Sequence, residues 1–274
     1  MNRFHLILAA FTLIPLVQSC ALGPSRTPEK RDDPLIGRII EARTADDISF
    51  NDLISAIAGN EVIYLSEKHD NPDQHKAQER IIRALAEYGR TSGRQPGIGF
   101  EFFAMAHTPD LLNFMDAKKV DHPDKVRVMV ERDLRMKLGW MNQPDSLWQF
   151  YFSLLSLARE LDLPVAGLDL APAVKKRITR KGMTGLTPLE AETIFSTGLD
   201  NPAYKSRMSD IFRAVHCGMG HERMQARLYD SWVARNDKMA HSITRLLAHS
   251  TGPVIIIMGN GHTEYGLGVM DRVA

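Results

Sequence analysis

Four short apolar runs along the chain have the pattern of buried strands. Each contains consecutive aliphatic or aromatic residues without a polar alternation, and each is too short for an independent helix. The runs cover residues 61–65, 97–103, 163–170 and 253–258. Strands that are apolar on both sides are typical of parallel sheets, which helices cover on both faces. The pattern therefore favours a parallel arrangement.

The segments between these runs have the apolar spacing of helices. After the first run, Asn71 supplies an N-cap and Pro72 the first helical position, and Gly89 is the predicted end of the helix. Residues 108–161 are predicted to be helical, with Leu111, Leu112 and Met115 in one helix, residues 126–138 in a second and residues 146–161 in a third. Residues 203–249 are predicted to form two helices around a glycine-rich turn. We predict an α/β fold with a mainly parallel sheet, many flanking helices and a ligand crevice at the carboxyl ends of the strands.

Residues 1–19 have the layout of a bacterial lipoprotein signal peptide. A short basic start precedes an apolar run from Leu6 to Val17, which is too short to span a bilayer permanently. The run ends in Leu-Val-Gln-Ser-Cys, which resembles a lipobox, so Cys20 is expected to become the lipidated first residue. Ala21 follows in place of aspartate, and the resemblance to sorted lipoproteins then implies the outer membrane. The alternative is an ordinary secreted protein with a fortuitous cysteine.

The remaining chain divides into a tether and one domain. Residues 20–34 contain three prolines and many charges without an apolar pattern, which predicts a disordered tether. Residues 35–274 show no internal repeat and no second linker, so they are predicted to form a single α/β domain. The composition, 44% hydrophobic and 24% charged, is that of a globular protein. A net charge of +1 provides no basis for binding nucleic acid, and two cysteines are too few for a disulfide framework.

Residues with ligand chemistry lie where the predicted strands end. They are Glu67, His69, Glu101, Asp169 and His262, and His75 follows the first pair closely. Because the carboxyl ends of parallel strands share one edge of a sheet, we expect these side chains to meet in the crevice. Carboxylates and imidazoles suit zinc, iron or an iron porphyrin. Two alternatives stay open: the loop histidines are only solvated or capping, and Glu101 forms a buried salt bridge with an arginine.

The segment from His216 to His221 (HCGMGH) looks like a soft metal site. Its glycines, however, break the helix that would align Cys217 with His221. We favour an interhelical turn in which His216 faces the crevice. The sequence contains no phosphate-binding glycine-rich loop, no nucleophile-elbow serine and no His-Glu-x-x-His helix.

Six segments carry a family resemblance over about residues 36–270. They are residues 66–75, 99–103, 148–172, 216–218, 235–240 and 259–269. In this order they resemble the ChaN family of haem-binding lipoproteins. The wider superfamily, which includes the Tiki metalloproteases, the TraB proteins and erythromycin-esterase-like proteins, is marked by Gly-x-x-His motifs and glutamates. Here Ser66 replaces the glycine of the first motif, and similar proteins usually continue past the last motif with a further strand.

The resemblance implies a haem-binding protein of the bacterial cell envelope, anchored by lipid in the outer membrane and facing the periplasm. It implies paired haems in a homodimer formed on haem binding, a tyrosine as axial ligand, and a role in haem or iron uptake or storage with outer-membrane haem-uptake machinery. Tyr265 is the nominated ligand because it lies three residues after His262, with Tyr64 and Tyr229 behind it. The expected haem-binding set is Glu67, His69, His75, Glu101, His216, His262 and Tyr265.

An alternative function uses part of the same set. As a metal-dependent hydrolase of the Tiki or erythromycin-esterase-like kind, the chain would hold zinc or manganese on Glu67, His69, Glu101 and His262. A metal-bound water would then attack an amide or ester. The Ser66 replacement and the lipobox both favour haem binding without catalysis.

Overall fold

The computed structural model describes residues 34–116, 124–192, 194, 201–215 and 222–273. Contacts divide the chain into two units, Met1–Arg38 and Ile39–Ala274, and the second unit contains the sheet and its helices. The predicted signal peptide and nearly all of the predicted tether lie outside the described residues. Within the described ranges, no helix combines the length and apolarity needed to cross a bilayer.

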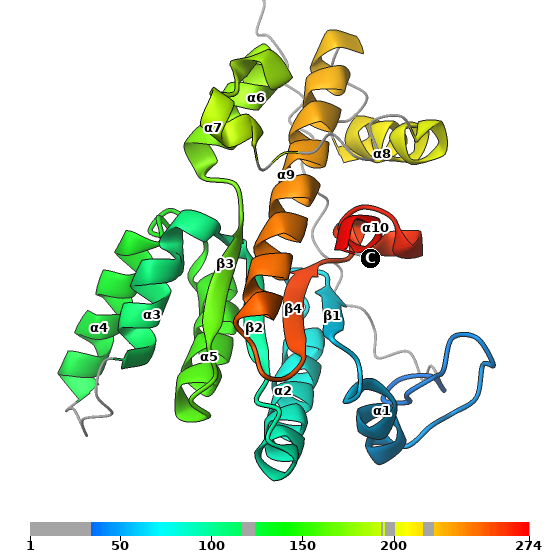
Figure 1. The fold of residues 1–274 in the computed structure, drawn as a ribbon, viewed down its shortest axis with the longest axis vertical. Helices are drawn as coiled ribbons and strands as arrows, with labels where there is room; N and C mark the ends of the chain where they lie inside the picture. The colour runs from blue at the N-terminus through cyan, green and yellow to red at the C-terminus, as the bar shows by residue number, and fades with distance from the viewer. Residues whose placement is uncertain (1–33, 117–123, 193, 195–200, 216–221, 274) are drawn as a thin grey trace, which may run out of the picture. The chain divides into compact units, whose positions relative to one another are not determined.

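Four strands form one parallel sheet in the order β1-β4-β2-β3 (Figure 1). They are β1 (Val62–Glu67), β2 (Gly97–Ala104), β3 (Val165–Asp169) and β4 (Val254–Gly259). The prediction of a parallel sheet is confirmed, and each strand overlaps its predicted run. β1 extends further than predicted, so that Glu67 is its last residue and pairs with Gly259 of β4.

Ten helices are formed by the described residues. They are α1 (Phe50–Ile57), α2 (Pro72–Ser92), α3 (Thr108–Asp116), α4 (Asp124–Lys137), α5 (Asp145–Glu160), α6 (Pro172–Lys181), α7 (Pro188–Ala191), α8 (Pro202–Val215), α9 (Glu222–Ala248) and α10 (Met270–Val273). Short 3₁₀ turns are η1 (Met105–His107), η2 (Met183–Gly185), η3 (Asn260–His262) and η4 (Glu264–Gly266). The predicted helical segments thus resolve into α3, α4 and α5 and into α8 and α9; the turn predicted between the last two lies outside the described residues.

The predicted end of α2 is wrong. Asn71 caps its start as expected, since its side chain accepts hydrogen bonds from the backbone amides of Asp73 and Gln74. The helix passes Gly89 and ends at Ser92, and Gly93 adopts the left-handed conformation with φ 72°. Gly89 is required by packing, because a Cβ there would lie 2.6 Å from the carbonyl oxygen of Arg94.

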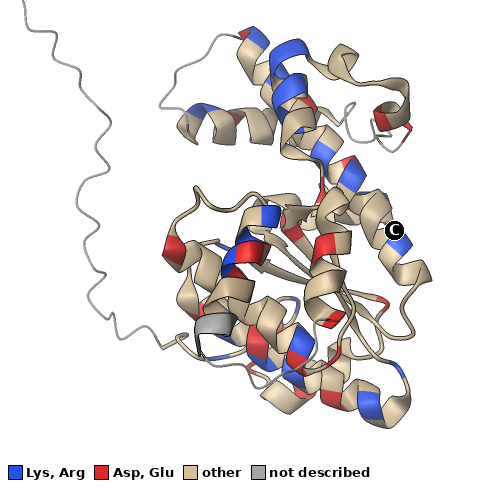
Figure 2. Ribbon diagram, turned by 90° about the vertical axis from the view of Figure 1, so that its left-hand side faces the viewer, with Lys and Arg blue, Asp and Glu red and all other residues tan. Residues whose placement is uncertain are grey.

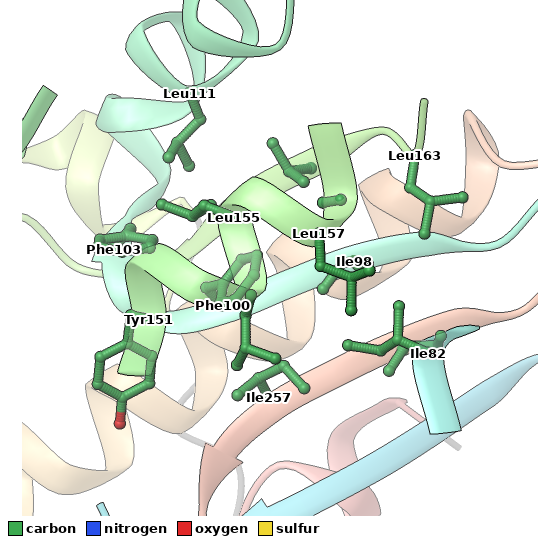
Figure 3. Close-up of a cluster of buried hydrophobic side chains, with 14 of the residues drawn as sticks. Ile82, Ile98, Phe100, Phe103, Leu111, Tyr151, Leu155, Leu157, Leu163 and Ile257 are labelled. Atoms are coloured by element: carbon green, nitrogen blue, oxygen red, sulfur yellow. The ribbon is translucent and has the colours of Figure 1, made fainter. Parts of the chain in front are cut away.

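Alternate side chains of the sheet pack on its two faces. Ile255 and Ile257 of β4 join the cluster made with α2 and α5, which includes Tyr151 (Figure 3). Ile256 and Met258 pack on the other face against α9. Every residue of β4 is buried, which explains its unbroken apolar run.

Charged residues of both signs are interspersed along the helices (Figure 2), as expected from the net charge of +1. The sheet brings four chain segments to one edge: the β1–α2 loop, the end of β2 with η1, the end of β3, and η3 after β4. The candidate residues predicted at the strand ends therefore come together there.

Candidate functional site at the strand ends

A cavity of ≈ 530 Å³ opens at the carboxyl ends of β2 and β3. Its polar lining comes from the strand ends, α6 and α9, and its apolar lining mainly from β2 and the loop after α4. The principal lining residues are His69, Glu101, Phe102, His107, Leu138, Trp140, Asp169, Leu170, Lys175, Ser231 and Arg235. Two residues of the predicted haem-binding set, His69 and Glu101, thus line the cavity, whereas Glu67, His75, His262 and Tyr265 do not.

Glu67 is a buried carboxylate, 1% exposed, whose two oxygens are occupied. Gln78 donates a hydrogen bond of 2.7 Å to Oε2, and the hydroxyl of Tyr151 donates to Oε1. His75 Nδ1 lies 3.3 Å from Oε2. His75 is itself buried, and its Nε2 lies 3.0 Å from the carbonyl oxygen of His69. Glu67 and His75 therefore lie behind the cavity and hold the β1–α2 loop.

His69 is the half-exposed member of the group, with 47% of its side chain accessible. Its Nδ1 lies 3.4 Å from Glu67 Oε1, and its ring meets Phe102 edge-on with centroids 4.6 Å apart. The hydrogen bond with Glu67 raises the pKa of His69 above its ordinary value, although partial burial opposes this. The ring packs directly on Gly259, where a Cβ would lie 2.6 Å from His69 Cε1. The last residue of β4 must therefore be a glycine for the His69 ring to lie this close to the strand.

Glu101 is buried and ionised in the last part of β2. Arg235 donates a hydrogen bond of 2.6 Å to its Oε1, and the amide of Gly259 donates one of 2.7 Å to its Oε2. His262 Nε2 lies 3.1 Å from Oε1. Burial alone would raise the pKa of Glu101, but His262, Arg235 and the Gly259 amide together hold it well below its ordinary range. The alternative of a buried salt bridge with an arginine is what the structure contains.

Arg235 joins two strand ends to α9. Besides Glu101 it contacts Asp169 at the end of β3, with Nε 3.1 Å from Asp169 Oδ2. Lys175 Nζ donates to the same oxygen at 2.7 Å, and the amide of Leu170 donates to Oδ1. Burial lowers the pKa of Arg235, but Asp169 and Glu101 outweigh it and keep the guanidinium charged. Helical spacing does not distinguish Arg235 or Lys175 as the partner of a distant carboxylate. The one signal in the sequence is the family resemblance, because its segment 235–240 begins at Arg235.

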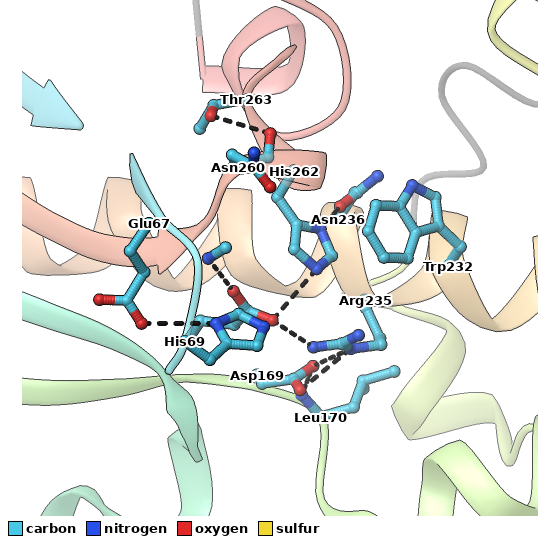
Figure 4. Close-up of polar contacts among 12 residues, drawn as sticks. Glu67, His69, Asp169, Leu170, Trp232, Arg235, Asn236, Asn260, His262 and Thr263 are labelled. Carbon is cyan, nitrogen blue, oxygen red and sulfur yellow. Dashed lines mark hydrogen bonds and ion pairs between the residues drawn. The ribbon is translucent and has the colours of Figure 1, made fainter. Parts of the chain in front are cut away.

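His262 contacts Glu101 and is not among the residues that line the cavity. Its ring lies beside Asn236 and Trp232 (Figure 4). It is 2% exposed and stacks on Trp232 with ring centroids 3.9 Å apart. Asn236 donates through Nδ2 to the Tyr204 hydroxyl, so its Oδ1 accepts from His262 Nδ1. Burial lowers the pKa of His262, although Glu101 opposes this shift. The contacts at both ring nitrogens hold the ring in a single orientation.

These side chains do not fit a divalent metal. Both oxygens of Glu101 and both of Glu67 are occupied by protein donors, including the charged guanidinium of Arg235. A cation at this position would have to displace Arg235 or lie beside it. No group of three or more histidine, cysteine or acidic side chains is arranged to hold a metal in the part of the chain that the structure describes. The geometry gives no support to the metal-dependent hydrolase.

Tyr265 is not among the residues that line the cavity, and 74% of the residue is exposed. It has φ 61° in a tight turn, and the guanidinium of Arg207 lies 4.2 Å from its ring centroid. Tyr229 is buried; burial raises the pKa of Tyr64 to about 12, and its hydroxyl has no hydrogen-bond partner among the described residues. Of the three tyrosines nominated, only Tyr265 presents its phenol to solvent. His216 lies outside the described residues.

The fold and the site define an α/β protein with a parallel sheet and a charged crevice at the strand ends. Residues 53–273 match the family model described as "Haem-binding uptake, Tiki superfamily, ChaN", and the chain belongs to this family. A solved structure of ChaN of Campylobacter jejuni, reported with cofacial haem binding, matches with a TM-score of 0.65 and 20% identity over 85% of this chain and 83% of that one.

The type III effector HopBA1 matches with a TM-score of 0.38 and 14% identity over 77% of this chain and 71% of that chain. No curated protein matches the chain.

Proposed function

We propose that this chain binds haem at the surface around Tyr265 and serves haem uptake or storage at the cell envelope. Membership of the haem-binding uptake family supports the ligand. The observation that carries the placement is the exposed phenol of Tyr265 beside the charged Arg207.

The chemistry of this surface fits a ferric porphyrin. Tyrosine is one of the protein ligands that hold haem iron, and a neighbouring guanidinium stabilises the negative charge of a tyrosinate. Arg207 is itself held by Glu264, which accepts its hydrogen bond at 2.6 Å. Gly266 and Gly268, with φ 72° and 82°, permit the turn that carries the tyrosine outward. When bound, the haem would supply the ferric iron, and the protein would supply the anionic ligand and its cationic neighbour.

An exposed ligand leaves the apolar faces of a porphyrin without cover from this chain. A second haem-bearing copy would bury them, since apolar surface is driven out of water. We therefore propose a homodimer that assembles on haem binding, because a ligand held at an interface stabilises the assembled state by mass action.

The envelope location is part of the same proposal. Lipidation of Cys20 would anchor the protein to the outer membrane on the periplasmic side, with the tether of residues 20–34 leading to the folded domain. Haem-uptake machinery of the outer membrane is the proposed partner, and the lipid is the proposed membrane contact.

Titration of the purified protein with haemin tests the ligand and its placement together. We expect a saturable spectrum of high-spin ferric tyrosinate, and a mass increase on haemin addition. Tyr265→Phe is expected to weaken binding at least tenfold and to remove the tyrosinate signature. Tyr88→Phe, at an exposed position on α2, is the matched control and should bind haemin like the wild type. Absence of saturable binding by the wild type would refute haem binding, and normal binding by Tyr265→Phe would refute the placement.

A further inference from the structure

We propose that the ≈ 530 Å³ cavity at the strand ends is a second ligand site, which binds a small monocarboxylate with an apolar body. This site is separate from the haem surface, because neither Tyr265 nor its neighbour Arg207 lines the cavity. The inference uses only the cavity's own residues and does not depend on haem binding.

The carboxylates of the cavity have their acceptor oxygens occupied. Glu101 accepts from Arg235 on one oxygen and from the Gly259 amide on the other. Asp169 accepts from Lys175 and Arg235 on Oδ2, and from the Leu170 amide on Oδ1. Each oxygen of these two carboxylates therefore accepts at least one hydrogen bond from the protein, so the lining does not favour a cationic ligand.

The cationic side chains keep hydrogen-bonding capacity that the protein does not use. An ammonium has three N–H groups, and Lys175 gives a hydrogen bond to Asp169 alone among the described residues. Arg235 donates through Nε and Nη2, and its Nη1 meets no acceptor in the described parts of the chain. The side chains of Lys175 and Arg235 are 33% and 21% exposed, and both line the cavity. The cavity is therefore matched to a ligand that accepts hydrogen bonds.

The charge balance selects a monoanion. The charges of Lys175 and Arg235 balance those of Glu101 and Asp169, so these four groups carry no net charge before a ligand enters. A single negative charge gains charge-assisted hydrogen bonds from Lys175 and Arg235. A dianionic phosphate would bring a second negative charge close to Glu101 and Asp169, and like charges at short range repel. A carboxylate is the group that satisfies both conditions.

The rest of the cavity suits an apolar body. Phe102, Leu138, Trp140 and Leu170 contribute side chains to its lining. The volume falls within the range of small-molecule pockets. An aromatic or aliphatic tail would lie against this wall while its carboxylate meets Lys175 and Arg235.

Calorimetric titration of the purified protein with 4-phenylbutyrate and with its neutral amide tests the proposal. We expect saturable binding of the carboxylate and at least tenfold weaker binding of the amide. Lys175→Gln should weaken carboxylate binding about tenfold and leave the weak amide binding unchanged, as expected for loss of one charge-assisted hydrogen bond. Lys176→Gln, at the next and exposed position of α6, is the matched control.

A second variant and a second state of the protein complete the test. Leu138→Trp fills the cavity from its apolar side and should abolish binding of the carboxylate while the fold, followed by circular dichroism, is retained. Haemin-saturated protein should bind 4-phenylbutyrate with unchanged affinity. Four outcomes would each overturn the separate carboxylate site. They are equal binding of the acid and the amide, no binding of either, an effect of Lys176→Gln as large as that of Lys175→Gln, and displacement of the acid by haemin. Binding of the acid by a wild type that takes up no haemin would refute the haem proposal alone.

Discussion

Replacing Arg235 by methionine is expected to destabilise the domain strongly at neutral pH. The substitution keeps much of the side-chain volume but leaves Glu101 and Asp169, which are 4% and 2% exposed, without their shared guanidinium. Removing one partner of a buried ion pair costs about 3–5 kcal/mol. Lys175 still pairs with Asp169, so the larger part of the loss falls on Glu101. Domains are stable by about 5–15 kcal/mol, and the variant should therefore fold with a clearly lower midpoint.

Urea unfolding measured from pH 7 to pH 3 is the assay. The pKa of Glu101 is depressed in the folded protein, so its stabilising contribution is present above its ordinary pKa of 4.5 and declines as the pH falls towards the folded value. In Arg235→Met that depression is reduced, and the deficit relative to the wild type should shrink on acidification. The double variant with Glu101→Gln should recover at least about 1 kcal/mol at pH 7, because the stranded charge is gone. A deficit below about 1 kcal/mol, or one that is independent of pH, would refute this account of the cavity.

Three further outcomes follow from the site and its surroundings. The imidazole of His69 should titrate above its ordinary pKa of 6.5 in histidine NMR spectra, and Glu67→Gln should lower that midpoint. Any stability gained from the charged ring is present below pH 6.5 and is lost as the pH rises through the pKa of His69 in the folded protein. Gly259→Ala should displace the His69 ring and lower the melting temperature, whereas Gly59→Ala, where a Cβ meets nothing within 4 Å, should not. Cys20→Ser should release the protein from the membrane fraction or leave the precursor uncleaved, and unchanged fractionation would contradict the anchor.

The sheet was predictable because its strands are apolar on both sides. The run from Val254 to Met258 has no polar alternation, and in the structure each of these residues is buried. The placement of Glu67, Glu101 and His262 at one edge of the sheet followed from the same reasoning, since parallel strands end at a common edge, but of these three only Glu101 lines the cavity.

What the sequence could not supply were contacts between distant elements. Arg235 lies 134 residues after Glu101 on an amphipathic helix with several basic residues, and no periodicity marks it as the partner. Gly89 lies inside α2 and does not end it: a Cβ there would clash with the carbonyl of Arg94, so this glycine reflects packing and is not a helix-ending signal. The direction of the Tyr265 ring likewise depends on a turn whose tertiary surroundings decide where it points.

The strand order carries a consequence for how the domain acquires its structure. β4, the last of the described strands in sequence order, lies between β1 and β2, so these two earlier strands are not hydrogen-bonded to each other. Val62 of β1 pairs with Val254 of β4, and these residues come from nearly opposite ends of the domain sequence. The edge of β1 that binds β4 therefore has no hydrogen-bond partner until β4 has been synthesised. Non-local pairing of this kind slows folding and prolongs exposure of unpaired strand edges. During synthesis on the ribosome, the N-terminal half of the domain should therefore remain dependent on chaperones until residues 254–259 emerge, and the cavity would be among the last parts to form.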